Sequence, residues 1–380
     1  MKSRYNVSII FIVIILIALN SCKHDLKLEM ELQDISPVFI TGTDGYECFR
    51  IPAIVSLTNG DLLAFAEGRV GGCSDTGDID LVMKRSMDLG SNWGPLQIIW
   101  NDSTNTCGNP APVVDINTGD VHVLITWNLG EDHESEIIAG TSTDTRRVFH
   151  LLSKDEGSSW STPKEITSTV KETSWTWYAT GPGSGIQLSH SSNKGRLVIA
   201  CDHIEAKSKK YYSHVIYSDD NGQSWELGGT TPQDQVNECE VAELTDGRLL
   251  LNMRNYDRNN KWRQIAYSAD GGLTWKDQKY DAQLIEPICQ ASLQTITFEN
   301  NNMLLFSNPA STEKRANMTL RVSYDQGESW ADSITIFRGP SAYSDLVIDQ
   351  NKQIGCLYEM GNKSPYEQIA FAKINLSSEN

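Results

Sequence analysis

Short apolar runs alternate with polar turn residues along almost the whole chain. Residues 53–57 are largely apolar, residues 58–61 read Thr-Asn-Gly-Asp, and residues 62–66 are apolar again. The same order recurs at residues 241–244, 245–248 and 249–252. Apolar runs of this length, bounded by Gly and Asn or Asp, predict β-hairpins. No stretch beyond the first 22 residues has a helical period, so the pattern predicts an all-β chain.

One turn sequence, Ser-x-Asp-x-Gly-x-x-Trp, occurs five times and is called the box below. The copies begin at Ser86, Ser153, Ser218, Ser268 and Ser323, with spacings of 67, 65, 50 and 55 residues. In such a turn the Asp can accept hydrogen bonds from turn amides, and the Gly adopts a backbone conformation closed to other residues. The Trp can pack under the turn and donate its indole N–H to the backbone. A repeat of this length predicts a propeller, an array or a solenoid.

Dividing the chain by the repeat length predicts the number of repeating units. Residues 37–380 comprise 344 residues, and the mean spacing of the boxes is 237/4, or about 59 residues. The quotient is close to six. Four-stranded blades fit that length, so the prediction is a six-bladed β-propeller of four-stranded antiparallel blades. We expect strands from both ends of the chain to close the last blade.

The first residues have the composition of an export signal. Lys2 and Arg4 precede an apolar run at residues 9–19, which is too short for a membrane span. The run ends in Leu-Asn-Ser-Cys, which resembles a bacterial lipoprotein signal with Cys22 as the lipidated residue. The alternative is an ordinary cleaved signal in which Cys22 is incidental. We therefore expect a signal peptide at 1–22, a tether at 23–36, and the propeller at 37–380.

This signal predicts an exported protein, lipid-anchored to a bacterial outer membrane or cell surface; the alternatives are a periplasmic or a secreted protein. The net charge of −17 argues against nucleic acid as a partner, because phosphate contacts need clustered Lys and Arg. Seven cysteines follow Cys22, so at least one is unpaired within the chain, and we expect most of them to be small buried side chains. Their spacing matches no metal motif. We expect a monomer, attached to the membrane only through its lipid.

Residues 49–52 read Phe-Arg-Ile-Pro, and together with the boxes this motif resembles the bacterial and animal exo-α-sialidases. The resemblance extends over about residues 37–372. It implies a six-bladed propeller, sialylated glycans as substrate, and no cofactor. It also implies that the boxes are structural turns, so that none of the box aspartates (Asp88, Asp155, Asp220, Asp270 and Asp325) is catalytic.

Three arginines bind the substrate's carboxylate in this family, and Arg suits the task because its planar fork matches a carboxylate in two hydrogen bonds. The matching positions are Arg50, Arg254 and Arg315. Arg321 competes with Arg315 but falls two residues before a box and reads as a strand residue. Glu359 matches the acid that orients the first arginine.

The nucleophile of the family is a tyrosine, because a carboxylate nucleophile would be repelled by the carboxylate already on the anomeric carbon. Tyr343 matches it. Since a neutral phenol is a poor nucleophile, a base must take its proton. Glu238 matches that base by motif position; Glu240, two residues further along the strand, is the alternative.

The glycine-rich segment 68–80 resembles the loop that carries the family's general acid, and Asp75 matches the acid itself. Asp78 and Asp80 are rivals within the same segment. Arg69 matches an arginine that contacts the sugar ring beside this loop. Two aromatic residues in the middle of the chain, Trp127 and Trp177, are candidates for lining the pocket, with hydrophobic core as the alternative.

The combined prediction is a retaining exo-α-sialidase that hydrolyses terminal sialic acid from glycoproteins, glycolipids and oligosaccharides through a covalent tyrosyl intermediate. A trans-sialidase or an anhydro-forming sialidase would use the same residues. Two non-enzymatic alternatives remain: a glycan-binding propeller without catalysis, and a structural repeat protein with no sugar site.

Overall fold

A computed structural model of the protein describes residues 28–378. The predicted hairpins are confirmed. Residues 53–56 and 62–66 fall in β2 and β3, which pair antiparallel across the turn at 57–61. Gly60 in that turn has a φ of 92°, a backbone conformation that glycine adopts without strain.

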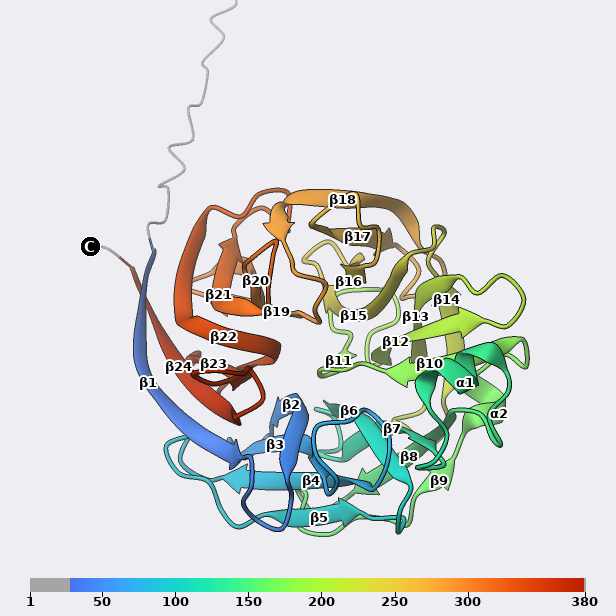
Figure 1. The fold of residues 1–380 in the computed structure, drawn as a ribbon. Coiled ribbons are helices and arrows are strands. Elements are labelled where there is room, and N and C mark those ends of the chain that lie inside the picture. Colours follow the sequence, from blue (N-terminus) through green and yellow to red (C-terminus); the bar gives the residue numbers. More distant parts are fainter. Residues whose placement is uncertain (1–27, 379–380) are drawn as a thin grey trace, which may run out of the picture.

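Strands dominate the fold, and consecutive strands pair antiparallel in groups; a parallel pair, Ile79↔Thr106, joins β4 to β6 and so links the first two groups (Figure 1). The first two groups are β2 (Cys48–Ser56), β3 (Leu62–Arg69), β4 (Ile79–Ser86) and β5 (Gln97–Trp100), then β6 (Thr106–Val114), β7 (Val121–Asn128), β8 (Arg147–Ser153) and β9 (Lys164–Glu165). The next two are β10 (Trp175–Thr180), β11 (Ile186–Gln187), β12 (Leu197–Glu205), β13 (Tyr211–Ser218) and β14 (Glu226–Thr230), then β15 (Val236–Glu243), β16 (Leu249–Asn255), β17 (Trp262–Ser268) and β18 (Lys276–Ile285). The remaining strands are β19 (Ser292–Phe298), β20 (Asn301–Pro309), β21 (Ala316–Ser323), β22 (Asp332–Ile348), β23 (Ile354–Met360), β24 (Gln368–Ser378) and β1 (Leu28–Ile40).

The groups are arranged around a common centre, as in a β-propeller, with the first strand of each group innermost (Figure 1). The long strand β22 belongs to two groups, because its first part pairs with β21 and its second part with β23. Hydrophobic clusters fill the space between successive groups. One such cluster packs Val347, Leu357 and Phe371 of the last strands against Phe49 and Ala64 of the first group. The hydrophobic core therefore runs between neighbouring sheets, including the last and the first.

Strand β1 corrects one expected boundary. Residues 28–36, expected to be part of a tether, belong to β1, which pairs antiparallel with β24 from Leu28↔Ser378 to Ile40↔Gln368. Strands from both ends of the chain therefore lie side by side. The expected signal peptide, Cys22 and the first residues of the tether lie outside the described residues.

Two short helices interrupt the sheets, α1 (Glu134–Ala139) between β7 and β8 and α2 (Thr167–Val170) after β9. Neither is long enough to show as a period in the sequence. No helix between residues 28 and 378 has the length and apolar composition needed to cross a membrane.

Each box forms the turn that leads into the last strand of a group, on the side of the sheet away from its innermost strand. In the copy that begins at Ser218, the Ser224 amide donates to Asp220 at 2.9 Å and the Gly222 amide donates to the Ser218 hydroxyl at 2.8 Å. The other four copies repeat these bonds. The predicted role of the Asp as an acceptor for turn amides is confirmed.

The prediction for the indole N–H of the box tryptophans was wrong. The indole of Trp330 donates to the Asp281 carboxylate at 3.0 Å rather than to the backbone. In the other four copies the indole N–H has no hydrogen-bond partner within the part of the chain that the structure describes. These rings contribute through packing: Trp225, for example, is 2% exposed and packs in the cluster between two groups. Burial of apolar ring surface therefore stabilises the turns more than the indole hydrogen bond does.

Candidate active site

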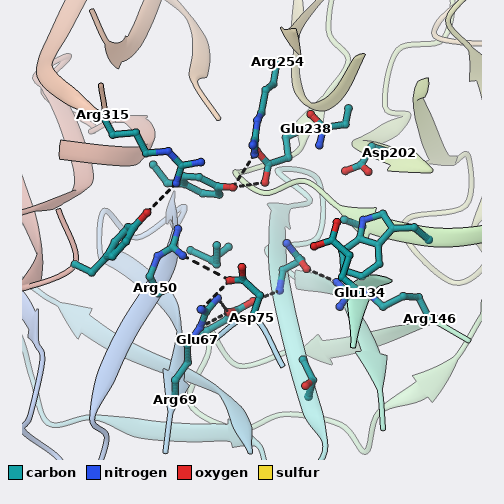
Figure 2. A pocket seen from close by; sticks show the side chains of 18 of the residues that line it. Arg50, Glu67, Arg69, Asp75, Glu134, Arg146, Asp202, Glu238, Arg254 and Arg315 are labelled. Atoms are coloured by element: carbon teal, nitrogen blue, oxygen red, sulfur yellow. Dashed lines mark hydrogen bonds and ion pairs between the residues drawn. The ribbon is translucent and has the colours of Figure 1, made fainter. Parts of the chain in front are cut away.

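The inner strands of several groups converge on a polar cavity of about 200 Å³ (Figure 2). Eight of the residues singled out from the sequence line it: Arg50, Arg69, Asp75, Trp177, Glu238, Arg254, Arg315 and Tyr343. They come from strands β2, β3, β10, β15, β16 and β22 and from two loops. None of the box aspartates lines this cavity.

Tyr343 and Glu238 are in direct contact in the wall of the cavity. The Tyr343 hydroxyl donates a hydrogen bond to Glu238 Oε1. Arg254 Nη1 donates to the same hydroxyl at 3.1 Å and also pairs with Glu238 Oε2. Burial, and next the negative charge of Glu238, raise the pKa of Tyr343 well above its ordinary value, although the nearby arginines oppose the rise. The free protein therefore holds a neutral phenol whose proton already points at a carboxylate.

Glu240, the alternative to Glu238, lies elsewhere. Its carboxylate accepts hydrogen bonds from the Ser292 hydroxyl at 2.8 Å and the Leu293 amide at 2.7 Å. It does not line the cavity. The structure thus places Glu238, and not Glu240, beside Tyr343.

Arginine side chains approach the Tyr343 ring from two sides. The guanidinium carbons of Arg50 and Arg315 lie 5.1 and 5.4 Å from the centre of the ring. Arg50 is held by Glu359, whose Oε1 accepts from Arg50 Nε at 2.7 Å. Glu359 is fully buried and also accepts from the Tyr343 amide at 3.1 Å. One buried carboxylate therefore fixes both an arginine and the backbone of the tyrosine, the place expected of Glu359.

Arg315 has a different environment. Its guanidinium donates to the Tyr366 hydroxyl at 2.9 Å and to the Ile288 carbonyl at 3.3 Å, and it has no carboxylate partner among residues 28–378. Its competitor Arg321 donates to Asn308 at 3.1 Å and does not line the cavity. Arg315 thus presents a cation without a paired anion to the cavity.

Asp75 faces these groups from the loop between β3 and β4 (Figure 2). Its carboxylate lies 2.8 Å from Arg69 Nη1 and 3.6 Å from Arg50 Nη1. Partial desolvation of its exposed side chain by the cavity walls raises the pKa of Asp75, but Arg69 and Arg50 lower it more, and the net shift is downward. In the free protein Asp75 is accordingly a carboxylate. Its rivals are placed elsewhere: Asp80 is buried and bonds Tyr46 at 2.6 Å, and neither Asp78 nor Asp80 lines the cavity.

The loop that carries Asp75 is tied to β2 by a disulfide between Cys48 and Cys73. No pattern of cysteine spacing indicated this pairing. The other five cysteines described by the structure are buried thiols, in agreement with the expectation for most of them.

Only one of the two tryptophan candidates, Trp177, lies at the cavity. Trp177 lines the cavity, with the guanidinium carbon of Arg146 4.1 Å from the centre of its ring. Trp127 does not line the cavity; it packs in a hydrophobic cluster and donates its indole N–H to Asp102 at 2.7 Å. For Trp127 the core alternative is therefore the correct one.

Several lining residues were missed from the sequence: Glu67, Asn109, Glu134, Arg146, Asp202, Tyr256 and Tyr366. Glu67 accepts from Arg69 Nε at 2.9 Å and from the Asn109 amide at 2.7 Å, so it orients Arg69 as Glu359 orients Arg50. Because Glu67 lies two residues before Arg69 on one strand, period-two alternation could have found it.

Asp202 is fully buried, and neither of its carboxylate oxygens has a hydrogen-bond partner in the described part of the chain. Burial raises the pKa of Asp202 well above its usual range, with Glu238 the next cause.

Two further carboxyl groups, those of Glu240 and Asp345, are buried among the inner strands β15, β19 and β22. Ser292 donates to Glu240 at 2.8 Å and to Asp345 at 3.2 Å, so one hydroxyl links the two acids. Burial, and next the neighbouring Asp345, raise the pKa of Glu240 well above its ordinary value. Burial raises the pKa of Asp345 to about 7. The pair therefore retains at least one proton at neutral pH.

The raised pKa values of Glu240 and Asp345 predict how the free energy of unfolding depends on pH. Because both folded-state pKa values are raised, the folded chain binds more protons than the unfolded chain, whose carboxyls titrate near pH 4. Stability should therefore fall as the pH rises from about 4 through 7, by up to about 1.4 kcal/mol per pH unit for each proton involved. In Glu240→Gln, which mimics a permanently protonated acid, the fall should be shallower. Urea unfolding at pH 5, 6, 7 and 8 tests this, and equal slopes for the two proteins would contradict it.

Within residues 28–378, no group of three or more His, Cys, Asp or Glu side chains is arranged to hold a metal ion.

Comparisons with known proteins agree with the geometry. Residues 60–356 match the BNR repeat-like domain family. A sialidase of Bacteroides fragilis is 30% identical over 339 residues, which cover 84% of this chain and 61% of that protein. Sialidase-3 of Mus musculus is 30% identical over 383 residues, which cover 85% of this chain and 90% of the mouse protein. The chain thus spans less than two thirds of the length of the bacterial relative.

Among solved structures, the Hadza microbial sialidase Hz136 superposes with a TM-score of 0.80 at 30% identity. The match covers 89% of this chain and 67% of that one. The arrangement of sheets around a centre is therefore shared with an experimentally determined protein.

Proposed function

This chain belongs to the sialidase family, and on that premise we propose that it is a retaining exo-α-sialidase. Its substrates would be glycoproteins, glycolipids and oligosaccharides that end in sialic acid. One observation carries the proposal: in a single cavity, a tyrosine hydroxyl bonds to a glutamate, arginines surround that tyrosine, and an aspartate lies opposite. An anionic sugar needs the arginines to bind its carboxylate. A phenol nucleophile needs the glutamate to take its proton.

Binding begins with the carboxylate of the sugar. Arg50, Arg254 and Arg315 line one side of the cavity and carry fixed positive charge, which attracts the substrate despite the acidic net charge of the chain. Arg315, which has no anion partner among the described residues, has its charge free for the sugar. The three guanidinium groups hold the carboxylate beside the Tyr343 hydroxyl.

The first chemical step transfers the sugar to the enzyme. Tyr343 Oη attacks the anomeric carbon as Glu238 takes the phenol proton, and Asp75 gives a proton to the departing glycosidic oxygen. The bond from the anomeric carbon to that oxygen breaks, and a bond to Tyr343 Oη forms. Arg254, which contacts both the phenol and Glu238, stabilises the negative charge that develops between them.

Asp75 must be protonated for this step, although its pKa is lowered in the free protein. Substrate binding changes its environment in two ways. The sugar carboxylate neutralises Arg50, one of the cations that lower the pKa of Asp75, and the sugar ring excludes water from the loop. Both changes raise the pKa of Asp75 towards the working range of a general acid.

The second step returns the enzyme to its starting state. Asp75, now a carboxylate, takes a proton from a water molecule whose oxygen attacks the anomeric carbon. The bond from that carbon to Tyr343 Oη breaks, and Glu238 returns its proton to the phenolate oxygen. Two displacements at one carbon retain its configuration. Arg69, fixed by Glu67, is proposed to contact the sugar ring next to Asp75, and Trp177 to line the pocket.

Product analysis by NMR tests this function. The protein is incubated with α2,3-sialyllactose, with Tyr343→Phe as the control. Early release of the α-anomer of free sialic acid, much slowed in the control, is the expected result. An anhydro or transferred product would keep the site and change the reaction class. If no sialyl linkage were turned over, the proposal of an enzyme would be wrong, and a glycan-binding propeller would be the remaining interpretation.

We propose six blades for the fold. Five groups each supply four main strands, and β22, β23, β24 and β1 supply the sixth, with β1 completing it from the other end of the chain. Each of the first five groups carries one box, which accounts for five boxes in six blades.

We also propose that the protein is exported and lipid-anchored through Cys22 to a bacterial outer membrane or cell surface, and that it acts as a monomer. The disulfide between Cys48 and Cys73 supports export, since disulfides persist in oxidising compartments. Metabolic labelling of Cys22 with a fatty-acid analogue tests the anchor: a Cys22→Ala variant should lose the label and appear in the medium or periplasm.

A further inference from the structure

The proposed general acid lies in a loop with few fixed contacts of its own. The loop joins β3 to β4 and contains Gly71, Gly72 and Gly77. The Asp75 side chain is 64% exposed, and Cys73 is exposed as well. An exposed glycine-rich segment has many accessible conformations. General-acid catalysis, however, needs the carboxyl within hydrogen-bond reach of the leaving oxygen.

Two kinds of contact hold Asp75 in place, one ionic and one covalent. The ionic contacts are those to Arg69 at 2.8 Å and to Arg50 at 3.6 Å. The covalent contact is the disulfide from Cys73, two residues before Asp75, to Cys48, which is fully buried in β2 two residues before Arg50. The Cys48–Cys73 disulfide therefore lies beside the Arg50–Asp75 ion pair, since each pair is offset from the other by two residues on both segments.

Arg69 joins the same arrangement. It is the direct cross-strand neighbour of Cys48, and its guanidinium donates to the Cys73 carbonyl at 2.7 Å. The loop is therefore anchored on the paired ends of β2 and β3, where both strands are buried. The anchor point is rigid, whereas the loop it holds is exposed.

The ionic contacts weaken at the moment of catalysis. To act as an acid Asp75 must carry a proton, and a neutral carboxyl has no ion-pair attraction to Arg69 or Arg50. The substrate's carboxylate also competes for Arg50. The disulfide is unaffected by protonation of Asp75 and by the substrate, as is the hydrogen bond from Arg69 to the Cys73 carbonyl, and it is the stronger of the two.

We propose that the Cys48–Cys73 disulfide is a positioning element of the reaction, which keeps Asp75 at the glycosidic oxygen after its ion pairs are lost. The inference rests on the proposed function, in which Asp75 is the general acid. Without the disulfide the enzyme still binds sialosides and still cleaves those whose leaving group departs without a proton. It becomes slow on natural glycans, whose alkoxide leaving groups need one. Full activity then requires the oxidising environment that forms the disulfide.

The test compares two substrates with unlike leaving groups. For the full chain and for a Cys48→Ser/Cys73→Ser variant, kcat/KM is measured on α2,3-sialyllactose and on 4-nitrophenyl α-sialoside. This parameter reports the steps up to departure of the leaving group. In the variant we expect a loss of roughly ten- to hundredfold on sialyllactose and about twofold or less on the aryl sialoside. Asp75→Asn should show the same selectivity with a larger loss on sialyllactose.

Reduction of the folded wild-type protein gives the same comparison without a substitution. Dithiothreitol followed by alkylation of Cys73 should reproduce the selective loss, and the same treatment should leave the Ser/Ser variant unchanged. An equal loss on both substrates, or no loss on either, would overturn the positioning role. Turnover by the untreated wild type tests the proposed function separately: a wild type that cleaves neither sialoside refutes that function, whereas an active wild type with an unselective variant refutes the inference alone.

Discussion

Replacing Glu238 by glutamine should lower kcat/KM on sialosides by a factor on the order of 10²–10⁴, the usual contribution of a general base. The variant keeps the shape of the side chain and its contact with the Tyr343 hydroxyl, but it cannot accept the phenol proton. Because burial raises the pKa of Tyr343 well above its ordinary value, no other state of the phenol supplies a nucleophile near neutral pH. Tyr343→Phe should lose at least as much, since it removes the attacking oxygen itself.

The two substitutions should not add. Tyr343 and Glu238 act in one step, so the double variant should be about as slow as the slower single variant. Multiplication of the two single effects would contradict a shared step. Since the phenyl ring stays packed between Arg50 and Arg315, the thermal midpoint of Tyr343→Phe should be close to that of the wild type. Calorimetric titration with the unsaturated analogue of sialic acid provides the control that the cavity still binds the sugar.

Local patterns in the sequence predicted the parts of the fold that local physics determines. A glycine at positive φ between two apolar runs defines a hairpin wherever it occurs, as at Gly60 and Gly247. The boxes identified the outer turns for the same reason, because the hydrogen bonds of their Ser and Asp side chains to turn amides lie within a few residues. The indole N–H of the box tryptophans was mispredicted, since its partner depends on what the neighbouring group offers. A closing strand from the start of the chain was expected, but residues 28–36 of β1 were assigned to a tether because their partner β24 lies at the other end of the chain.

The site itself is not a local feature. Tyr343 and Glu238 are 105 residues apart in sequence, and Arg50 and Glu359 are 309 apart. No periodicity brings such pairs together, and only the resemblance to a family placed them. The residues without a family motif, such as Arg146 and Asp202, were therefore missed although both line the cavity. The Cys48–Cys73 pairing was missed for a similar reason, because seven cysteines allow many pairings and the spacing favours none.

Arg50 and Arg315 should both be needed for activity, but only one of them should be needed for stability. Arg50→Ala leaves Glu359 as a buried carboxylate without its cation, and loss of one partner of a buried ion pair costs about 3–5 kcal/mol of unfolding free energy. Arg315→Ala leaves no such charge, since Arg315 has no acidic partner in the region that the structure describes. We expect urea unfolding to separate the two variants, while both raise KM for sialosides.

A second substitution tells the two roles of Arg50 apart. Adding Glu359→Gln to Arg50→Ala removes the orphaned charge and keeps an acceptor for the Tyr343 amide. Most of the lost stability should therefore return. Activity should not, because the carboxylate of the sugar still lacks its arginine. If the double variant regained turnover, Arg50 would serve only to neutralise Glu359; if it stayed as unstable as Arg50→Ala, the cost would lie in lost packing of the guanidinium against Tyr366, which lies 4.1 Å from it.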